Sequence, residues 1–280
     1  MHQKLKNSLA ISISAAVLTL SFFARADELS DKGRDIFNKH QHAVVTVQLV
    51  QKIAANGKYQ ARESKQEVTG TVLDSSGLTV LALSSCDPSE LTRRMTSDSS
   101  LEIELSDIKI MLEDGTEIPA DIVLRDKDLD LAFIRPKTKT AAPMDAIELG
   151  KASHAQVLDQ LITLNRLKRA AGRAFSASVE RISAVVQKPR TFYIPDGSQT
   201  DTTLGSPAFA LDGNVVGLVV MRAVSAQGAA SMRDCLTAII LPAEDIAKAA
   251  SQAPTEVKPE EPKKDASAKT DAPKVPAKAP

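Results

Sequence analysis

The sequence predicts an all-β fold, and three observations carry this prediction. Short runs rich in Val, Ile and Leu recur along residues 43–241, with turn residues between them. The clearest turns are Asp74-Ser75-Ser76-Gly77 and Glu113-Asp114-Gly115, and the second predicts a hairpin. Residues 136–147 contain two prolines and an alanine pair, and they separate six expected strands from six more. This regular spacing indicates β-barrels or a β-sandwich.

The expected strands fall into two sets. The first covers residues 43–50, 67–73, 78–83, 108–112, 118–124 and 131–135, and the second covers residues 156–164, 174–186, 191–194, 206–210, 215–221 and 237–241. Residues 86–107 are polar and predict a long surface loop with a short helix at 89–95. Residues 32–39 have a short helical pattern. A closing helix is expected at 243–251, because Pro242 starts it and Glu244 and Asp245 complement its N-terminal dipole.

Both ends of the chain differ from this β-rich part. Residues 1–26 predict a secretory signal peptide, because Lys4 and Lys6 precede an apolar run and Ala24-Arg25-Ala26 is a cleavage site. The run is shorter than a membrane-spanning helix requires, so we expect cleavage, export to the periplasm or the medium, and no transmembrane segment afterwards. Residues 252–280 are almost wholly Pro, Lys, Ala, Glu, Asp, Ser and Thr, which predicts a disordered tail.

The composition excludes several classes of function. The chain has 280 residues and a formal net charge of 0, and loss of residues 1–26 removes three positive charges and leaves about −3. No basic excess is available to neutralise phosphates, so we expect no nucleic-acid partner. Two cysteines and four scattered histidines lack metal-ligand spacing, and there is no glycine-rich phosphate loop. We expect no metal and no cofactor.

The two cysteines, Cys86 and Cys235, allow two interpretations. An exported protein enters an oxidising compartment, where the pair can form a disulfide. The alternative is two separate buried thiols. Because the sequence does not give the distance between them, both interpretations stay open.

Four stretches support a more specific interpretation. They resemble strand motifs of the HtrA/Deg branch of trypsin-like serine proteases, and they occur in the same order and with similar spacing. The four stretches are residues 70–80, 112–134, 207–217 and 240–243. The Asp-Leu-Ala motif at 130–132 and PAFALDGNVVG at 207–217 are the most specific. The resemblance covers about residues 43–250. It implies two six-stranded antiparallel β-barrels at about 43–136 and 148–241, with a cleft between them and a closing helix at 243–251. The resemblance thus implies one protease-homology domain at 27–251, which contains both barrels, the closing helix and the segment before the first barrel. We do not expect the family's PDZ domain.

The resemblance also places the catalytic triad. A serine attacks, a histidine accepts its proton and an aspartate orients the histidine. The family's histidine falls on Ser84, its aspartate on Asp130 and its serine on Leu204. A serine hydroxyl is not a general base at neutral pH, and leucine has no nucleophilic atom. We expect Asp130 to accept hydrogen bonds from Ser84 or from nearby backbone N–H groups, and no intact triad.

The oxyanion loop, over Thr203, Leu204 and Gly205, keeps a single glycine. A rival alignment makes Ser206 the nucleophile, but it deletes the loop glycines and places proline directly after the nucleophile. The remaining candidates for a relocated base are the histidines, and each is expected to be a solvated surface residue or, at position 2, part of the signal peptide. The four positions are His2, His40, His42 and His154.

Three functions remain open at this point. The favoured one is a pseudoprotease, an exported inactive protease homologue whose cleft binds a peptide or a protein partner, such as an active protease or an unfolded polypeptide. The second is an active serine endopeptidase with Ser206 as a non-standard nucleophile. The third is a structural protein of the cell envelope, suggested by the Lys/Pro/Ala-rich tail.

Overall fold

A computed structural model describes residues 28–55, 62–96, 101–196, 203–224 and 235–256. The expected signal peptide lies outside these ranges, as does the expected tail except for its first five residues. Within the described ranges, no helix has both the length and the apolar character needed to cross a membrane.

The first barrel closes in the strand order β1-β2-β3-β6-β5-β4. All neighbouring strands are antiparallel, and every pair consecutive in this barrel keeps a continuous or once-bulged register. The strands are β1 (Val44–Ala55), β2 (Arg62–Val72), β3 (Thr79–Ala82), β4 (Leu101–Met111), β5 (Glu117–Asp126) and β6 (Leu131–Pro136).

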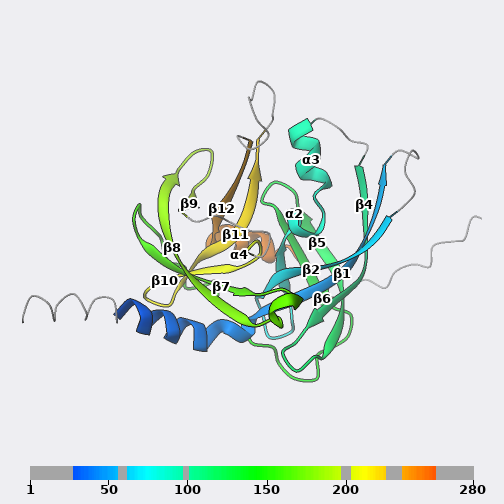
Figure 1. The fold of residues 1–280 in the computed structure, drawn as a ribbon, viewed down its shortest axis with the longest axis horizontal. Coiled ribbons are helices and arrows are strands. Elements are labelled where there is room, and N and C mark those ends of the chain that lie inside the picture. Colours follow the sequence, from blue (N-terminus) through cyan, green and yellow to red (C-terminus); the bar gives the residue numbers. More distant parts are fainter. Residues whose placement is uncertain (1–27, 56–61, 97–100, 197–202, 225–234, 257–280) are drawn as a thin grey trace, which may run out of the picture.

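The second barrel closes in the order β10-β11-β12-β9-β8-β7, again antiparallel throughout. Its strands are β7 (Gln160–Arg166), β8 (Phe175–Val186), β9 (Phe192–Pro195), β10 (Pro207–Ala210), β11 (Val215–Ala223) and β12 (Leu236–Pro242). Figure 1 shows the two barrels side by side. The prediction of two six-stranded antiparallel barrels is confirmed.

Short helices complete the fold. Residues 28–40 are helical and run along the second barrel, and α4 (Ala243–Ala250) closes the chain as expected. Two 3-10 turns are η1 (Gln41–Ala43) and η2 (Arg169–Ala171), and two helices follow β3, namely α2 (Leu83–Cys86) and α3 (Ser89–Thr96). In Figure 1, α3 stands where the two barrels meet, beside the upper end of β11.

Two sequence predictions were wrong in this region. The expected loop over residues 86–107 ends early, because β4 already begins at Leu101. Ile103 and Leu105 alternate with the exposed Glu102 and Glu104, which is the pattern of a strand with one face against the core. The expected strand at 78–83 also stops at Ala82, and Leu83 opens α2.

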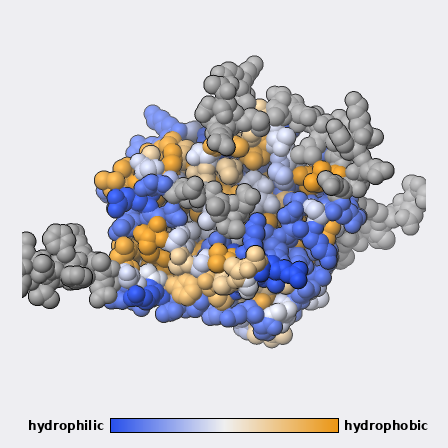
Figure 2. Space-filling model, in the orientation of Figure 1, coloured by the Kyte–Doolittle hydropathy of each residue, from blue (hydrophilic) through white to orange (hydrophobic). Residues whose placement is uncertain are grey.

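One apolar core joins the two barrels. Leu78, Val80 and Phe133 of the first barrel belong to the same buried cluster as Val219 and Ile240 of the second. The expected tail begins as an ordered segment against the first barrel, where the Nε of Arg135 donates to the carbonyl oxygen of Pro254 at 3.1 Å. On the face drawn in Figure 2, apolar residues form small groups scattered among polar ones.

Candidate functional site

Ser84 and Asp130 meet at the junction between the barrels. The hydroxyl of Ser84 donates to Oδ2 of Asp130 at 2.8 Å, and its backbone N–H donates to Oδ1 at 2.7 Å. The N–H of Met221 on β11 donates to Oδ2 at 2.8 Å. Asp130 thus accepts three hydrogen bonds from both barrels, which confirms the expectation that it is bonded to Ser84 and to backbone N–H groups.

The backbone around Asp130 explains this geometry. Asp130 has φ +59°, a left-handed conformation that short polar side chains tolerate, and it directly precedes β6. Its carbonyl oxygen accepts the N–H of Leu83 at 2.8 Å, which ties the start of α2 to the start of β6. Ser84 is therefore held over the carboxylate by the backbone as well as by its hydroxyl.

Burial controls the charge of Asp130. Removal of the carboxylate from water raises its pKa from 3.8 to about 6, although the hydrogen bonds from Met221 and Ser84 lower it. The group is therefore ionised at neutral pH and becomes protonated in mildly acidic solution. A serine hydroxyl beside it has no proton-accepting role at either pH.

Leu204 lies in the core and not on a cleft surface. Its exposed fraction is 4%, and it belongs to the cluster that joins the two barrels. The loop around it is hydrogen-bonded to both barrels. The N–H of Gly205 donates to the carbonyl oxygen of Val219 at 2.8 Å, and the hydroxyl of Thr71 donates to the carbonyl oxygen of Gly205 at 2.8 Å. An apolar side chain thus occupies the position that the sequence alignment gave to a nucleophile.

Gly205 fits this packing because it has no side chain. Its φ is +88°, and a Cβ built on it would lie 2.3 Å from the carbonyl oxygen of Thr69. No other residue could adopt this backbone conformation and also approach β2 so closely. The loop of residues 203–206 is therefore pressed directly against the first barrel.

A narrow cleft remains beside Ser84 and Asp130, with a volume of about 40 Å³, enough for one or two water molecules. We call it the inter-barrel cleft. Its walls come from α2, α3, the loop before β6, Arg190 and the end of β11; among the lining residues are Glu90, Leu91, Arg94, Asp128, Val220 and Ala223.

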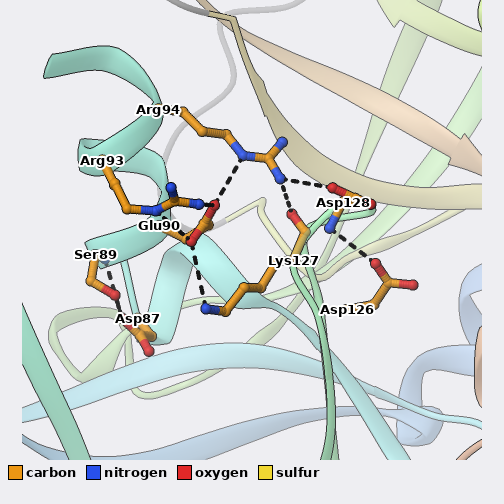
Figure 3. Close-up of polar contacts among 8 residues, drawn as sticks. All are labelled: Asp87, Ser89, Glu90, Arg93, Arg94, Asp126, Lys127 and Asp128. Atoms are coloured by element: carbon orange, nitrogen blue, oxygen red, sulfur yellow. Dashed lines mark hydrogen bonds and ion pairs between the residues drawn. The ribbon is translucent and has the colours of Figure 1, made fainter. Parts of the chain in front are cut away.

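An ionic cluster holds α3 over this cleft (Figure 3). Glu90 bonds Arg93 and Arg94 on its own helix, and Lys127 Nζ lies 3.6 Å from Glu90. Arg94 Nη2 also donates to Asp128 Oδ1 and to the carbonyl oxygen of Lys127, both at 3.0 Å. Through these contacts the helix is tied to the loop that precedes Asp130.

Comparison with known proteins identifies the family to which this fold belongs. The sequence profile of the trypsin-like peptidase domain matches residues 68–218, more than half of the chain. The chain belongs to the trypsin-like peptidase family. The matched region contains Ser84, Asp130 and Leu204. A search of curated proteins finds no match.

Two solved structures are similar to this chain. Deg5 aligns with a TM-score of 0.50 and 15% sequence identity, over 78% of this chain and 92% of Deg5. The apo protease domain of MamO from Magnetospirillum magneticum aligns with a TM-score of 0.48 and 15% identity, over 76% of this chain and 97% of that domain. At this identity, the similarity to Deg5 concerns the fold alone.

Ser206, the rival nucleophile of this trypsin-like domain, is fully buried, with an exposed fraction of 0%. Its hydroxyl donates to Oδ1 of Asn165 at 3.3 Å, and the hydroxyl of Thr69 donates to the same oxygen at 2.9 Å. An activated serine needs a base within hydrogen-bond reach and room for a substrate carbonyl. An amide oxygen in a packed interior supplies neither.

The backbone donors of the loop are already used. An oxyanion hole requires N–H groups that point at a developing negative charge. Here the N–H of Gly205 donates to Val219, and the N–H of Ser206 donates to the carbonyl of Thr203 at 3.1 Å. These two N–H groups are therefore already hydrogen-bonded within the protein and do not point at a substrate oxygen.

The three histidines of the described ranges make contacts elsewhere in the molecule. His42 lies beside Glu113 at 3.2 Å, and the exposed His154 lies 3.6 Å from Glu244. His40 corrects the sequence prediction of a solvated residue, since its ring stacks on Phe209 at 4.7 Å, its Nε2 is buried, and burial lowers its pKa. None of these three lines the inter-barrel cleft.

Cys86 and Cys235 are both buried, and the structure does not join them in a disulfide. Burial raises the pKa of the Cys86 thiol to about 12, so it stays protonated and unreactive at neutral pH. Of the two interpretations left open by the sequence, this geometry corresponds to separate thiols. Within the described ranges, no group of three His, Cys, Asp or Glu side chains is arranged to hold a metal ion.

Proposed function

We propose that this protein is an exported, catalytically inactive member of the trypsin-like family that binds an extended peptide between its barrels. One observation carries the loss of activity. The Ser84 hydroxyl occupies the carboxylate oxygen that would orient a histidine, while Leu204 fills the nucleophile position from within the core. Export is supported by the signal-peptide pattern of residues 1–26.

Peptide binding is supported by the backbone of β11. The N–H of Val224 donates to the carbonyl oxygen of Cys235 at 2.9 Å, next to the β11–β12 ladder. In an antiparallel pair, the backbone N–H and C=O groups of every second residue bond to the partner strand, and those of the residues between point away from it. Val219 and Met221 point away, and their N–H groups bond to Ser206 and Asp130. Ala223 continues this alternation, so its N–H and C=O face the inter-barrel cleft. A peptide strand can pair with this edge by β-strand addition.

The helix α3 must move for such a strand to enter, because the cleft of about 40 Å³ is too small for one. Several partners in the ion pairs that hold α3 are open to water, since Asp128 is 82% and Lys127 63% exposed, although Glu90 itself is 11% exposed. Exposed pairs of this kind contribute little each, about 0.2–1 kcal/mol. We therefore regard α3 as a cover, a weakly held helix that lies over the β11 edge.

The binding test uses fluorescein-labelled, carboxymethylated casein, an unfolded polypeptide, with the mature chain of residues 27–280. Ala223→Pro removes the N–H that would pair with the peptide and leaves the β12 ladder intact, whereas Ala223→Val keeps that N–H. Fluorescence anisotropy should show binding to the wild type and to Ala223→Val. Loss of one backbone hydrogen bond should weaken binding of Ala223→Pro about fivefold.

Two results would reject this proposal: no binding of casein by the wild type, or equal binding by the two variants. The third function considered above, a structural role in the cell envelope, depends on the tail beyond residue 256. That part lies outside the described residues, so the hypothesis stays a prediction.

A further inference from the structure

Arg166, the last residue of β7, is a buried cation that makes no ion pair with a described carboxylate. Its exposed fraction is 7%, and its Nε is fully buried without a hydrogen-bond partner. Two other arginines differ, since Arg173 is bonded to Glu67 and Arg135 to Ser76 and Asp74.

An unpaired buried charge is costly, so its presence calls for a physical explanation. A guanidinium keeps its proton at neutral pH and cannot avoid the cost by becoming neutral. Burial is the main cause that lowers the pKa of Arg166, and Glu113 acts in the opposite direction. Glu113 does not pair with Arg166, because its carboxylate lies against His42 and its side chain is 62% exposed.

Arg166 lines a groove of about 560 Å³, within the size range of small-molecule and short-peptide sites. We call it the Arg166 groove. Its walls come from the start of β1, the β4–β5 hairpin, the connector at residues 138–145, and Phe175 at the start of β8. No residue lines both this groove and the inter-barrel cleft, so the two sites are separate.

The shape of the site favours a planar anion. The guanidinium carbon of Arg166 lies 4.0 Å from the centre of the Phe175 ring, which covers one face of the group. The ring of His42 also contacts Phe175 in a T-shaped arrangement, at 5.1 Å between ring centres. With one face covered, a ligand meets the guanidinium along its edge, where arginine binds a carboxylate through two parallel hydrogen bonds.

The charges of the groove add a second preference. Four carboxylates line it besides Arg166 and Lys139, namely Glu113, Asp114, Glu117 and Asp145, and Asp145 is exposed. Apolar side chains, among them Val45 and Met144, also line it. A ligand that carries a carboxylate, an apolar part and a basic group therefore finds a partner for each of these parts in the groove.

We infer that the Arg166 groove is a carboxylate-binding site, in which Arg166 holds the carboxylate of a peptide C-terminus or of a small organic acid. This site is independent of the proposed peptide binding at β11. Failure of one leaves the other in place, because they share no lining residue.

Isothermal titration calorimetry tests the site with two tripeptides, acetyl-Ala-Val-Lys as the free acid and as the C-terminal amide, added to the mature protein. A charge-assisted bidentate contact predicts that the acid binds about tenfold more tightly than the amide. Arg166→Gln should abolish this difference. Arg173→Gln is the matched control, since it removes a nearby arginine that is already paired, and it should retain the difference.

Competition with valerate separates the two sources of carboxylate. Displacement of the peptide acid by valerate identifies a small organic acid as sufficient, and no displacement identifies a peptide C-terminus. Equal binding of acid and amide by the wild type overturns the inference. That comparison needs no variant, so it decides the question even if Arg166→Gln does not fold.

Discussion

The two halves of the barrel junction differ in character. In the first barrel, Ser84, which the family resemblance places at the histidine position, donates a hydrogen bond to Asp130, so this half is polar and partly open to the inter-barrel cleft. In the second barrel, Leu204, which the resemblance places at the serine position, belongs to the core, with 4% exposure. One half holds a hydrogen-bonded carboxylate and the other packs an apolar side chain.

This difference teaches how each half is stabilised. A buried carboxylate needs hydrogen-bond donors, so the residue beside it is polar. The loop of the other half gains stability by burying an apolar side chain. We therefore expect substitutions in the Leu204 half to act mainly on stability, and substitutions in the Ser84 half to act mainly on the titration of Asp130.

The largest effect is expected at Gly205. Gly205→Ala would force a Cβ to within 2.3 Å of the Thr69 carbonyl oxygen, at φ +88°. Left-handed strain and overpacking together should cost about 4 kcal/mol of unfolding free energy, measured by urea denaturation. Gly213→Ala is the control, because Gly213 has φ +83° but open space around its Cβ position. Similar losses in both variants would show that the loop is not pressed against β2.

Leu204→Ala should lower the unfolding free energy by about 3 kcal/mol, the typical cost of a buried leucine. The exposed Leu158, with 67% exposure, provides the control substitution Leu158→Ala, which should change the same quantity by less than about 0.5 kcal/mol. A loss of under about 1 kcal/mol for Leu204→Ala would indicate a solvent-facing side chain, as in an open cleft.

Ser84→Ala should act on charge more than on packing. It removes a hydrogen bond to the ionised carboxylate, so the pKa of Asp130, about 6 in the wild type, should rise further. The stability loss should be about 1.5 kcal/mol at pH 8 and smaller at pH 5, where Asp130 is mostly protonated. Carbon-13 NMR of the Asp130 carboxyl measures the pKa directly.

Ser85→Ala is the control for this titration, since the Ser85 hydroxyl donates to the Ala82 carbonyl and does not contact Asp130. The pH dependence of wild-type stability follows from thermodynamic linkage. The folded state holds the Asp130 proton more tightly than the unfolded state, so this residue's contribution to stability is full below pH 3.8 and is lost as pH rises through about 6. An unchanged pKa in Ser84→Ala would contradict the hydrogen bond.

The smallest effect is expected at α3. Glu90→Gln removes the charge shared by Arg93, Arg94 and Lys127; because these cations stay open to water, the loss should be about 1 kcal/mol. Hydrogen exchange of the α3 amides should become faster, and casein should bind more tightly. Glu63→Gln removes a separate ion pair with Lys52 and should change neither quantity. Slower exchange, or weaker casein binding, would show that α3 is not a cover.

Much of this account could be predicted from the sequence. Apolar runs and turn signals predicted an all-β fold, and the family resemblance predicted the two barrels and placed Ser84 with Asp130. The start of β4 was missed because Glu102 and Glu104 made the segment look like a loop, although the apolar residues between them alternate with a strand period.

Other features depend on contacts between distant segments. Arg166 ends a buried strand, but nothing near it in the sequence shows that its buried Nε has no hydrogen-bond partner. The stacking of His40 on Phe209 joins residues that are far apart along the chain. The position of α3 over the cleft also depends on the loop at Lys127 and Asp128.

The central claim, absence of peptidase activity, is tested most directly with a fluorophosphonate probe and a casein digest. The mature wild type, the variant Ser206→Ala and an active trypsin-like peptidase are treated in parallel, with mass spectrometry of the labelled sites. We predict that the wild type is neither labelled nor able to cleave casein, and that it matches Ser206→Ala. Labelling at Ser206, or cleavage that Ser206→Ala abolishes, would contradict the claim.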